Sequence, residues 1–407
     1  MHMIGRLRGG RRRLLVGVTC FVAAVGADST SAGAQPWVAT PTPNATPNSN
    51  ILEAAAASPA SVWAVGRALH GDPNGSGDYL PLILRHTSSG WRVDPGAVLP
   101  SDTFLAFLSD VLTVKREVWA VGGIDISSPE GAPRHPLVEH WDGTQWRLAP
   151  YPVFIRGGEL VSLSDVPTTG VIWAVGIGTT STSSLRTRSA YWDGTAWHPV
   201  AMPPDPLPDS SELIGVEALA ADDVWAVGTN GGGEHGSAPF PSVDPFAEHW
   251  DGHAWRIVNL PPSGCAGENS GPVMHTLTRV PGTRQLWAIG RCDDFTVLGH
   301  ATSLAYHYVG GAWRHVALPS PYRYTDLRGV TATGPNDVWA VGWGGSSSIH
   351  PVVLHRDGTG WHSESLATLP SSASLSAATF TARRIWVVGS HPNRTVGDRT
   401  FAAYKPR

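Results

Sequence analysis

Short apolar runs separated by turn-forming residues recur along this chain, and their lengths predict β-strands rather than helices. Between residues 326 and 366, Leu327–Ala332 forms one such run, and Val338–Gly342 follows after the turn residues Gly-Pro-Asn-Asp. A third run, Pro351–Arg356, leads into an Asp-Gly dipeptide, which favours a tight hairpin because glycine tolerates positive φ. Trp361 then opens a fourth run. The pattern predicts a four-stranded antiparallel meander.

This unit repeats along the chain, and its most regular part is a Trp followed by Ala-Val-Gly or a near copy in the second strand. The copies are 47 to 62 residues apart, a period typical of β-propeller repeats. They begin at Trp63, Trp119, Trp173, Trp225, Trp287, Trp339 and Trp386. We therefore predict an all-β fold, a seven-bladed β-propeller of four-stranded antiparallel blades.

The two ends of the repeat array are incomplete in complementary ways. The last copy has three runs, Ser374–Phe380, Ile385–Gly389 and Phe401–Lys405, and then the chain stops. Trp37 opens an isolated segment that resembles a fourth strand. We predict that residues 35–43 complete the last blade and close the ring in a 3+1 arrangement, which leaves no free sheet edge.

Tryptophan is abundant, with 18 residues, and 17 of them occupy repeated positions in the second, third or fourth strands. A four-stranded unit of this kind buries both faces only by stacking on its neighbours, so we expect these indoles to fill the spaces between blades. Trp343 is the one tryptophan outside the pattern.

The N-terminus has the pattern of an export signal. An arginine-rich segment, Arg6 to Arg13, precedes the apolar stretch Leu14–Ala27 and the small residues Ala32-Gly33-Ala34. We predict that residues 1–34 are a signal peptide and that residues 35–407 are a secreted or extracytoplasmic propeller. The apolar stretch is shorter than the roughly 20 residues that cross a bilayer, so an anchor is the weaker alternative and no membrane span is expected in the mature chain.

Two cysteines remain after removal of that signal, Cys265 and Cys292. They flank the first two strands of one repeat, at ends that lie side by side in an antiparallel hairpin. In an oxidising compartment we expect them to form a disulfide; a reactive or metal-binding thiol pair is the alternative.

Charge argues against one class of partner. Residues 35–407 carry 24 Lys and Arg against 32 Asp and Glu, and no basic cluster remains in them. Nucleic acid is therefore not expected as a partner, since neutralisation of phosphate charge dominates the binding of nucleic acids.

We expect the mature protein to be a monomer.

The sequence motif Asp-Val-Trp-Ala-Val-Gly, followed by Glu-His-Trp-Asp-Gly-Thr-x-Trp, resembles the repeats of the secreted bacterial propellers of the kelch and galactose-oxidase-like superfamily. The resemblance covers residues 35–407 and implies the propeller fold. It implies little about function, because one propeller scaffold carries enzymes, lectins and scaffold proteins that differ in their loops.

A binding site is expected where the longer second-to-third links and the fourth-to-first links gather, opposite the tight hairpin turns. Trp343, with Tyr322 and Tyr324, is a candidate aromatic platform for a sugar ring; loop packing is the alternative. The first-strand residues Glu53, Asp110, Glu217 and His275 are candidates to line an axial channel, either as binding residues or as water-facing wall.

One loop carries a weak calcium pattern. Asp72, Asn74, Ser76 and Asp78 place oxygen donors at alternate positions with glycine at the bend, but the glutamate that would complete a calcium loop is replaced by Ile83. An ordinary hairpin tip is the favoured interpretation. Calcium is the one cofactor that the sequence suggests, and otherwise none is expected.

No catalytic constellation emerges from these motifs, so enzymatic activity stays undecided with a preference against it. We expect a non-enzymatic propeller that binds a protein partner or a surface glycan through its long-loop face. A carbohydrate-active enzyme, a sialidase-like hydrolase or a lyase, is one alternative. A passive envelope or assembly scaffold is the other.

Overall fold

The computed structural model describes residues 35–71, 77–126, 134–154, 157–179, 185–204, 211–229, 245–265, 270–294, 300–393 and 397–407. Gln35–Arg407 forms a compact unit of its own. Its described residues contain strands and turns but no helix, which agrees with the predicted all-β class. None of them belongs to a helix of the length and hydropathy needed to cross a bilayer. The predicted signal peptide lies outside the described residues.

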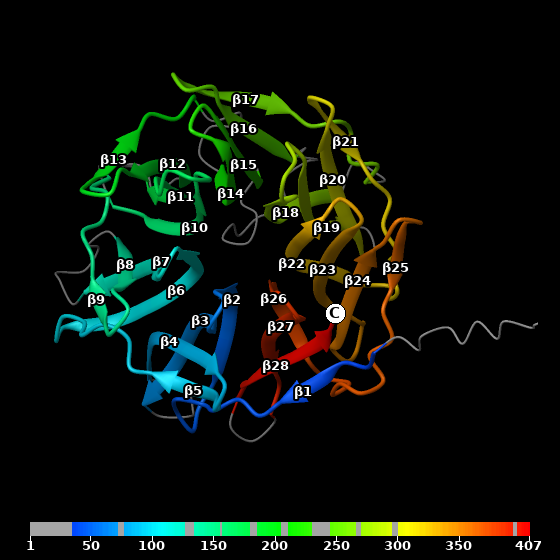
Figure 1. Ribbon diagram of the computed structural model, residues 1–407, viewed down its shortest axis with the longest axis horizontal. Coiled ribbons are helices and arrows are strands. Elements are labelled where there is room, and N and C mark those ends of the chain that lie inside the picture. Colours follow the sequence, from blue (N-terminus) through cyan, green and yellow to red (C-terminus); the bar gives the residue numbers. More distant parts are fainter. Residues whose placement is uncertain are drawn as a thin grey trace, which may run out of the picture. The chain divides into compact units, whose positions relative to one another are not determined.

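The strands form antiparallel meanders in chain order, as the repeat predicts (Figure 1). One sheet has eight strands because two successive meanders are joined by a single parallel pair, Tyr79 with Leu105. Its strands are β2 (Asn50–Ala57), β3 (Val62–Gly71), β4 (Gly77–Thr87), β5 (Gly90–Asp94), β6 (Thr103–Val114), β7 (Glu117–Ile126), β8 (His135–Trp141) and β9 (Trp146–Leu148).

Four further meanders form one four-stranded sheet each. The first two consist of β10 (Glu159–Asp165), β11 (Ile172–Thr179), β12 (Leu185–Trp192) and β13 (Trp197–Val200), then β14 (Glu212–Ala220), β15 (Asp223–Thr229), β16 (Phe246–Trp250) and β17 (Trp255–Asn259). The next two consist of β18 (Ser270–Arg279), β19 (Leu286–Asp294), β20 (Ala301–Val309) and β21 (Ala312–His315), then β22 (Thr325–Gly334), β23 (Asp337–Gly344), β24 (His350–Arg356) and β25 (Trp361–Ser363).

The last sheet combines the two ends of the unit. It contains β26 (Ser374–Thr381), β27 (Arg384–His391), β28 (Arg399–Pro406) and, at its outer edge, β1 (Val38–Thr40). Strand β1 pairs antiparallel with β28, with Val38 opposite Tyr404 and Thr40 opposite Ala402. Beside β1, the Trp37 side chain is 2% exposed and its ring meets Trp339 edge-on at 5.9 Å.

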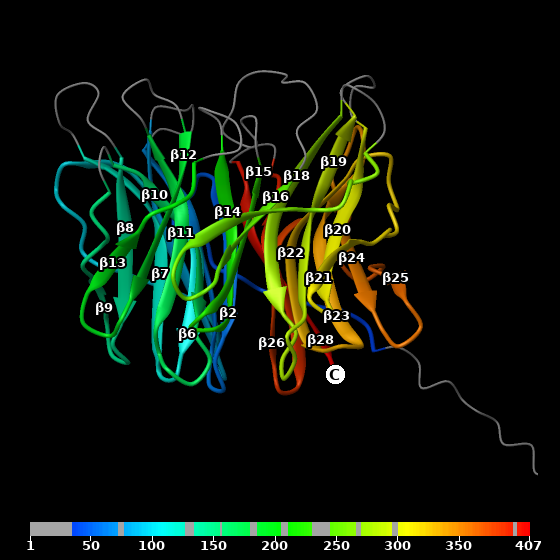
Figure 2. The same cartoon turned by 90° about the horizontal axis from the view of Figure 1, so that it is seen from above.

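The first strand of each meander lies on the inner side of the unit (Figure 1), and the strands run between two faces (Figure 2). Successive first strands contact one another, and β26 contacts β2 in turn. The first strands are β2, β6, β10, β14, β18, β22 and β26. No sheet of the described chain closes on itself by hydrogen bonds; the sheets meet through side-chain packing.

Indole rings fill those contacts, as the sequence predicts. The seven second-strand tryptophans are all 5% exposed or less. Six of them lie in apolar clusters that join two neighbouring meanders, and the seventh, Trp386, meets Trp91 of a neighbouring meander edge-on at 5.7 Å. Trp225 shows the local arrangement: its ring stacks on His249 at 4.2 Å, and the Asp223 carboxylate accepts hydrogen bonds from its indole N–H and from His249. The repeated Asp, Trp and His therefore serve packing rather than ligand chemistry.

Candidate functional site: the central cavity

Every first strand carries a one-residue β-bulge at an equivalent place. The register shifts between Leu52 and Ala54 in β2, and the same shift recurs in the other six first strands. The bulged residues are Glu53, Ser109, Val161, Ile214, His275, Arg328 and Ser376. A bulge redirects a side chain out of the ordinary alternation, and all seven of these side chains line one cavity.

The glycine of the Trp-Ala-Val-Gly repeat makes these bulges possible. The residue before each bulge pairs with that glycine, as Leu327 does with Gly342. A Cβ atom on any of the seven glycines would lie 1.9 to 2.1 Å from a first-strand carbonyl oxygen. Only glycine permits so close an approach of two backbones. The motif that defines the repeat therefore also fixes one inward-facing residue per meander.

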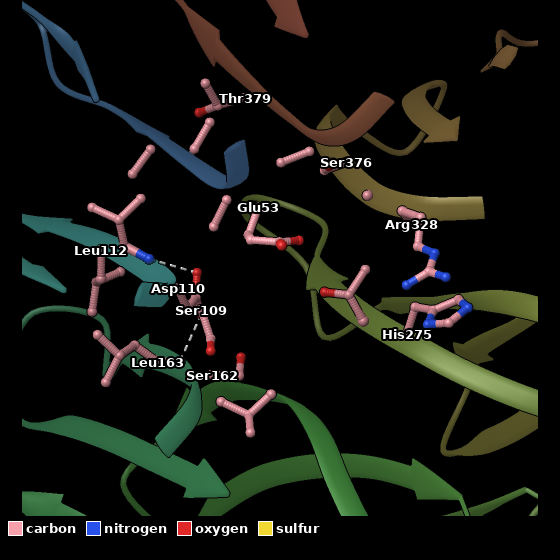
Figure 3. A pocket seen from close by; sticks show the side chains of 18 of the residues that line it. Glu53, Ser109, Asp110, Leu112, Ser162, Leu163, His275, Arg328, Ser376 and Thr379 are labelled. Carbon is pink, nitrogen blue, oxygen red and sulfur yellow. Dashed lines mark hydrogen bonds between the residues drawn. The ribbon is translucent and has the colours of Figure 1, made fainter. Parts of the chain in front are cut away.

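The cavity has a volume of about 1140 Å³ and is lined mainly by the first strands (Figure 3). We call the end where first strands begin and second strands end the loop face. The lining side chains include carboxylates, guanidiniums, hydroxyls and aromatic rings. Among them are four residues singled out from the sequence: Glu53, Asp110, Glu217 and His275.

Asp110 lies in the middle of this wall and connects two first strands. Its carboxylate accepts hydrogen bonds from the Val111 amide at 2.7 Å and from the Leu163 amide of β10 at 2.8 Å (Figure 3). Burial raises the pKa of Asp110 to about 6, although those two amides and the Ser162 hydroxyl favour the charged form.

Glu217 makes the same kind of connection two meanders further on. Its carboxylate accepts hydrogen bonds from the Ser164 hydroxyl of β10 at 2.9 Å and from the Arg279 amide of β18 at 3.2 Å. Burial raises its pKa, and the neighbouring Arg279 guanidinium opposes that effect. Arg279 also binds the Asp165 carboxylate and the carbonyl oxygens of Asp165 and Ala218. These polar groups satisfy the inner edges of first strands that no further strand covers.

Two more arginines in the wall are held by carboxylates. Arg134 binds Asp125 through two nitrogens, at 3.0 and 3.1 Å, and Glu159 at 2.7 Å. Arg67 lies 3.4 Å from the Glu53 carboxylate, and both of these side chains remain partly exposed.

A buried carboxylate organises the wall that contains His275. The Asp326 side chain is fully buried and meets one imidazole and two guanidinium groups: His275 Nε2 at 2.9 Å, Arg291 Nη1 at 3.1 Å and Arg328 Nε at 2.8 Å. Asp293 also holds Arg291 Nε, at 2.9 and 3.0 Å. Despite its burial, which favours the neutral acid, the contacts with His275, Arg328 and Arg291 hold the pKa of Asp326 well below its usual range.

The predicted aromatic platform is split, which corrects the expectation that its three rings act together. Trp343 lines the central cavity and stacks on Tyr324 with ring centroids 4.9 Å apart. Tyr322 instead stacks on His350 at 5.1 Å and lines a separate pocket on the outer side of the sheet. The chain bends at Tyr322 and Arg323, where the Thr325 hydroxyl donates to the Tyr322 carbonyl oxygen at 3.1 Å, and this bend separates the two tyrosine rings.

The two remaining sequence predictions have different outcomes. Cys265 and Cys292 form the expected disulfide, with Cα atoms 5.8 Å apart, and Cys292 lies within β19 rather than after it. Of the calcium pattern, Asp72, Asn74 and Ser76 lie outside the described residues, and Asp78 pairs with His70 in the β3–β4 hairpin. Within the part of the chain that the structure describes, no group of three His, Cys, Asp or Glu side chains could hold a metal ion.

Arg134, Arg279, Arg328 and Ser376 belong to the cavity wall but were not singled out from the sequence. A signal for the bulged residues does exist, because each lies 13 to 15 residues before the glycine of its repeat. The arginines that pair across meanders carry no such signal.

Comparison with known proteins supports the fold and little more. No family model matches this sequence, and no curated protein is a significant sequence relative. The resemblance to the kelch and galactose-oxidase-like superfamily therefore has no support from sequence comparison.

Solved structures of β-propeller type are similar to this chain along most of its length. A structure of YCF48 bound to D1 peptide has 16% sequence identity and a TM-score of 0.51, covering 93% of this chain and 99% of that one. A polysaccharide lyase, an ulvan lyase of family PL25, has 11% identity and a TM-score of 0.54, covering 91% and 94%. At these identities the likeness defines the class of fold alone, a β-propeller-like all-β protein.

Proposed function

We propose that residues 35–407 form a seven-bladed β-propeller, completed by β1, that binds a glycan in its central cavity at the loop face. The blade count is supported by seven meanders whose first strands contact one another in sequence and then return from β26 to β2. The pairing of β1 with β28 supports closure by the N-terminal segment. The disulfide supports an extracytoplasmic location, since such bonds persist in oxidising compartments.

The observation that carries glycan binding is the Trp343 indole in the cavity wall, with hydroxyl groups on the next meander. Ser374, Ser376 and Ser390 line the same cavity from β26 and β27. Sugars present apolar C–H faces and polar edges together, so an indole beside hydroxyl and charged groups suits them. A cavity of about 1140 Å³ has room for a ligand of drug size or larger.

Glycan-array binding by the full chain tests this proposal, followed by calorimetry with the best ligand. We expect Trp343→Ala to weaken binding at least about tenfold, because the sugar loses its stacking face. Tyr151→Ala is the matched control, since Tyr151 is 42% exposed and does not line the cavity. Equal effects of the two substitutions would overturn the assignment of the site, and a blank array would favour a scaffold or a protein-binding role.

A carbohydrate-active enzyme is the second candidate, supported by the raised pKa values of Asp110 and Glu217 in the same cavity. A carboxyl group with a raised pKa suits general acid catalysis. A panel of chromogenic glycosides, read beside the glycan array, distinguishes the two candidates. Turnover that disappears in Asp110→Asn while binding persists would establish the enzyme.

A further inference from the structure

We infer that the ligand of the central cavity is an extended glycan chain, with one sugar unit on Trp343 and another on Phe107. This inference rests on the proposed function and adds the class of the ligand, an oligosaccharide rather than a single terminal sugar. It follows from the repeat positions that line the loop-face end of the cavity, and from the meanders that separate the two aromatic rings among them.

Two positions of each meander lie beside the bulge on its loop-face side. One is the residue that follows the repeat glycine in the second strand, and the other is its partner in the first strand, as Trp343 pairs with Asp326. In five meanders, which follow one another from β22 through β26, β2 and β6 to β10, one or both of these residues line the cavity. They include Trp343, Ser374, Ser390, Arg67 and Phe107. These five meanders therefore form one continuous wall.

Trp343 and Phe107 are the aromatic residues at these positions, and both remain partly exposed. Each ring is held by a neighbouring group. Trp343 stacks on Tyr324 at 4.9 Å, and the Arg134 guanidinium lies 5.2 Å from the centre of the Phe107 ring. A ring that is already fixed loses little conformational freedom when a ligand binds. Both rings can therefore serve as platforms for the C–H face of a sugar.

The place of the Phe107 ring depends on Gly123, the residue that follows the repeat glycine in β7. A Cβ atom at Gly123 would lie 3.0 Å from Cζ of Phe107 and 2.7 Å from Cδ of Arg134. The missing side chain leaves room for the phenyl ring. This meander thus presents an aromatic ring from its first strand, where the meander of Trp343 presents one from its second strand.

Two complete meanders separate the two rings. Strand β22 contacts β26, β26 contacts β2, and β2 contacts β6, so the meander of Phe107 is the third one after that of Trp343. Neighbouring strands lie at least about 5 Å apart. One sugar ring is too small to cover three such steps. A ligand that uses both platforms therefore contains several linked sugar units.

Polar side chains line the wall between the two platforms. Ser374 and Ser390 line the cavity from the meander next to Trp343. In the following meander, the Glu53 carboxylate, which Figure 3 shows in the cavity, lies 3.4 Å from the Arg67 guanidinium, and both side chains are partly exposed. Such an ion pair offers acceptors and donors to sugar hydroxyls without favouring either sign of ligand charge. The cavity of about 1140 Å³ also exceeds the roughly 300–1,000 Å³ of pockets for drug-sized ligands, as a chain requires.

Isothermal titration calorimetry with the full chain tests the inference. The probes are oligosaccharide ladders of one to six units from cellulose, xylan, chitin and polygalacturonate. We expect at least one ladder in which the six-unit member binds about tenfold or more tightly than the two-unit member, because only the longer chain reaches both platforms. Phe107→Ala should abolish this gain without changing the affinity for the two-unit member, which stays on Trp343. Phe107→Leu should do the same, because leucine keeps an apolar side chain but has no aromatic face.

Phe104→Ala is the matched control, because Phe104 lies on the same strand, is 47% exposed and does not line the cavity. Thermal unfolding of each variant establishes that it is folded. The inference is overturned, with glycan binding intact, if affinity rises with length in no ladder, if the rise survives in the Phe107 variants, or if Phe104→Ala removes it equally. If no ladder binds at all, the inference is overturned too, and the glycan array decides whether the proposed function is overturned with it.

Discussion

At the scale of single residues, the polar side chains of the cavity have a structural task that sequence patterns do not reveal. First strands have an uncovered edge toward the central axis, and side chains from neighbouring strands occupy it. Asp110 accepts from the Leu163 amide, Ser162 from the Val216 amide and Ser164 from the Ala218 amide. Carboxylates and hydroxyls in such a channel therefore hold adjacent meanders together, whether or not they also meet a ligand.

The contribution of Asp110 to stability can be tested through its dependence on pH. Its pKa is about 6 in the folded chain and close to 3.8 when unfolded, so the folded state binds the extra proton between those values. Stability from this group is therefore gained as the pH falls from about 6 toward 4 and is lost as the pH rises again. The shift in the pKa of Asp110 corresponds to a change of roughly 2–3 kcal/mol in the free energy of unfolding across this pH range.

Urea denaturation between pH 4.5 and 7.5 measures the effect, with Asp110→Asn as the comparison. We expect the free energy of unfolding of the natural chain, relative to Asp110→Asn, to increase toward the acidic end. A pH-independent difference between the two chains would contradict the assigned pKa.

At the scale of elements, the repeated second-strand glycine connects sequence to site. Strand boundaries followed from apolar runs and Asp-Gly turns: the run Pro351–Arg356 became β24 (His350–Arg356), and the run Ile385–Gly389 became β27. The bulge opposite each glycine could not be predicted from those runs, because it depends on how two strands pair. That bulge decides which first-strand residue faces the cavity.

Gly342→Ala tests the link, with Gly334→Ala as its control in the same sheet. A Cβ at Gly342 would lie 1.9 Å from the Asp326 carbonyl oxygen, whereas a Cβ at Gly334 meets nothing within 4 Å. We expect Gly342→Ala to lower the free energy of unfolding by about 3 kcal/mol or more and Gly334→Ala to change it by less than about 0.5 kcal/mol. Chemical denaturation of both variants gives the comparison, and similar losses in the two would show that the bulge tolerates a side chain.

At the scale of the whole unit, the N-terminal segment packs against the last two meanders and adds its strand β1 to the edge of β28. Trp37 lies in the apolar cluster that contains Trp339 and Leu375, so it bridges the last two meanders. Its backbone carbonyl oxygen also accepts a hydrogen bond from the Thr368 hydroxyl at 2.6 Å. Contacts so distant in sequence form late in folding and contribute mainly to holding the completed unit together.

We expect Trp37→Ala to lower the free energy of unfolding by about 3–5 kcal/mol, because removal of a buried indole leaves a cavity that the neighbouring side chains fill poorly. Val38, the next residue, is 38% exposed, and we expect Val38→Ala to lower the free energy of unfolding by less than about 1 kcal/mol. Denaturant unfolding of the two variants provides the test. A loss for Trp37→Ala no larger than that for Val38→Ala would mean that the N-terminal strand does not hold the unit together.

The sequence by itself determined the class of fold, the strand order within each meander, the tryptophan packing positions and the disulfide. These features depend on local turn chemistry and on a repeat whose successive copies pack against one another in the same way, so the order of residues along the chain is enough to predict them. Only the tertiary structure decided that Tyr324 and Trp343 stack while Tyr322 turns away, and that Arg328, His275 and Arg291 share Asp326. The contacts of His275 and Arg291 with Asp326 join different meanders, and the separation of the two tyrosines depends on a bend of the chain, so the spacing of residues along the sequence does not tell which of these side chains meet.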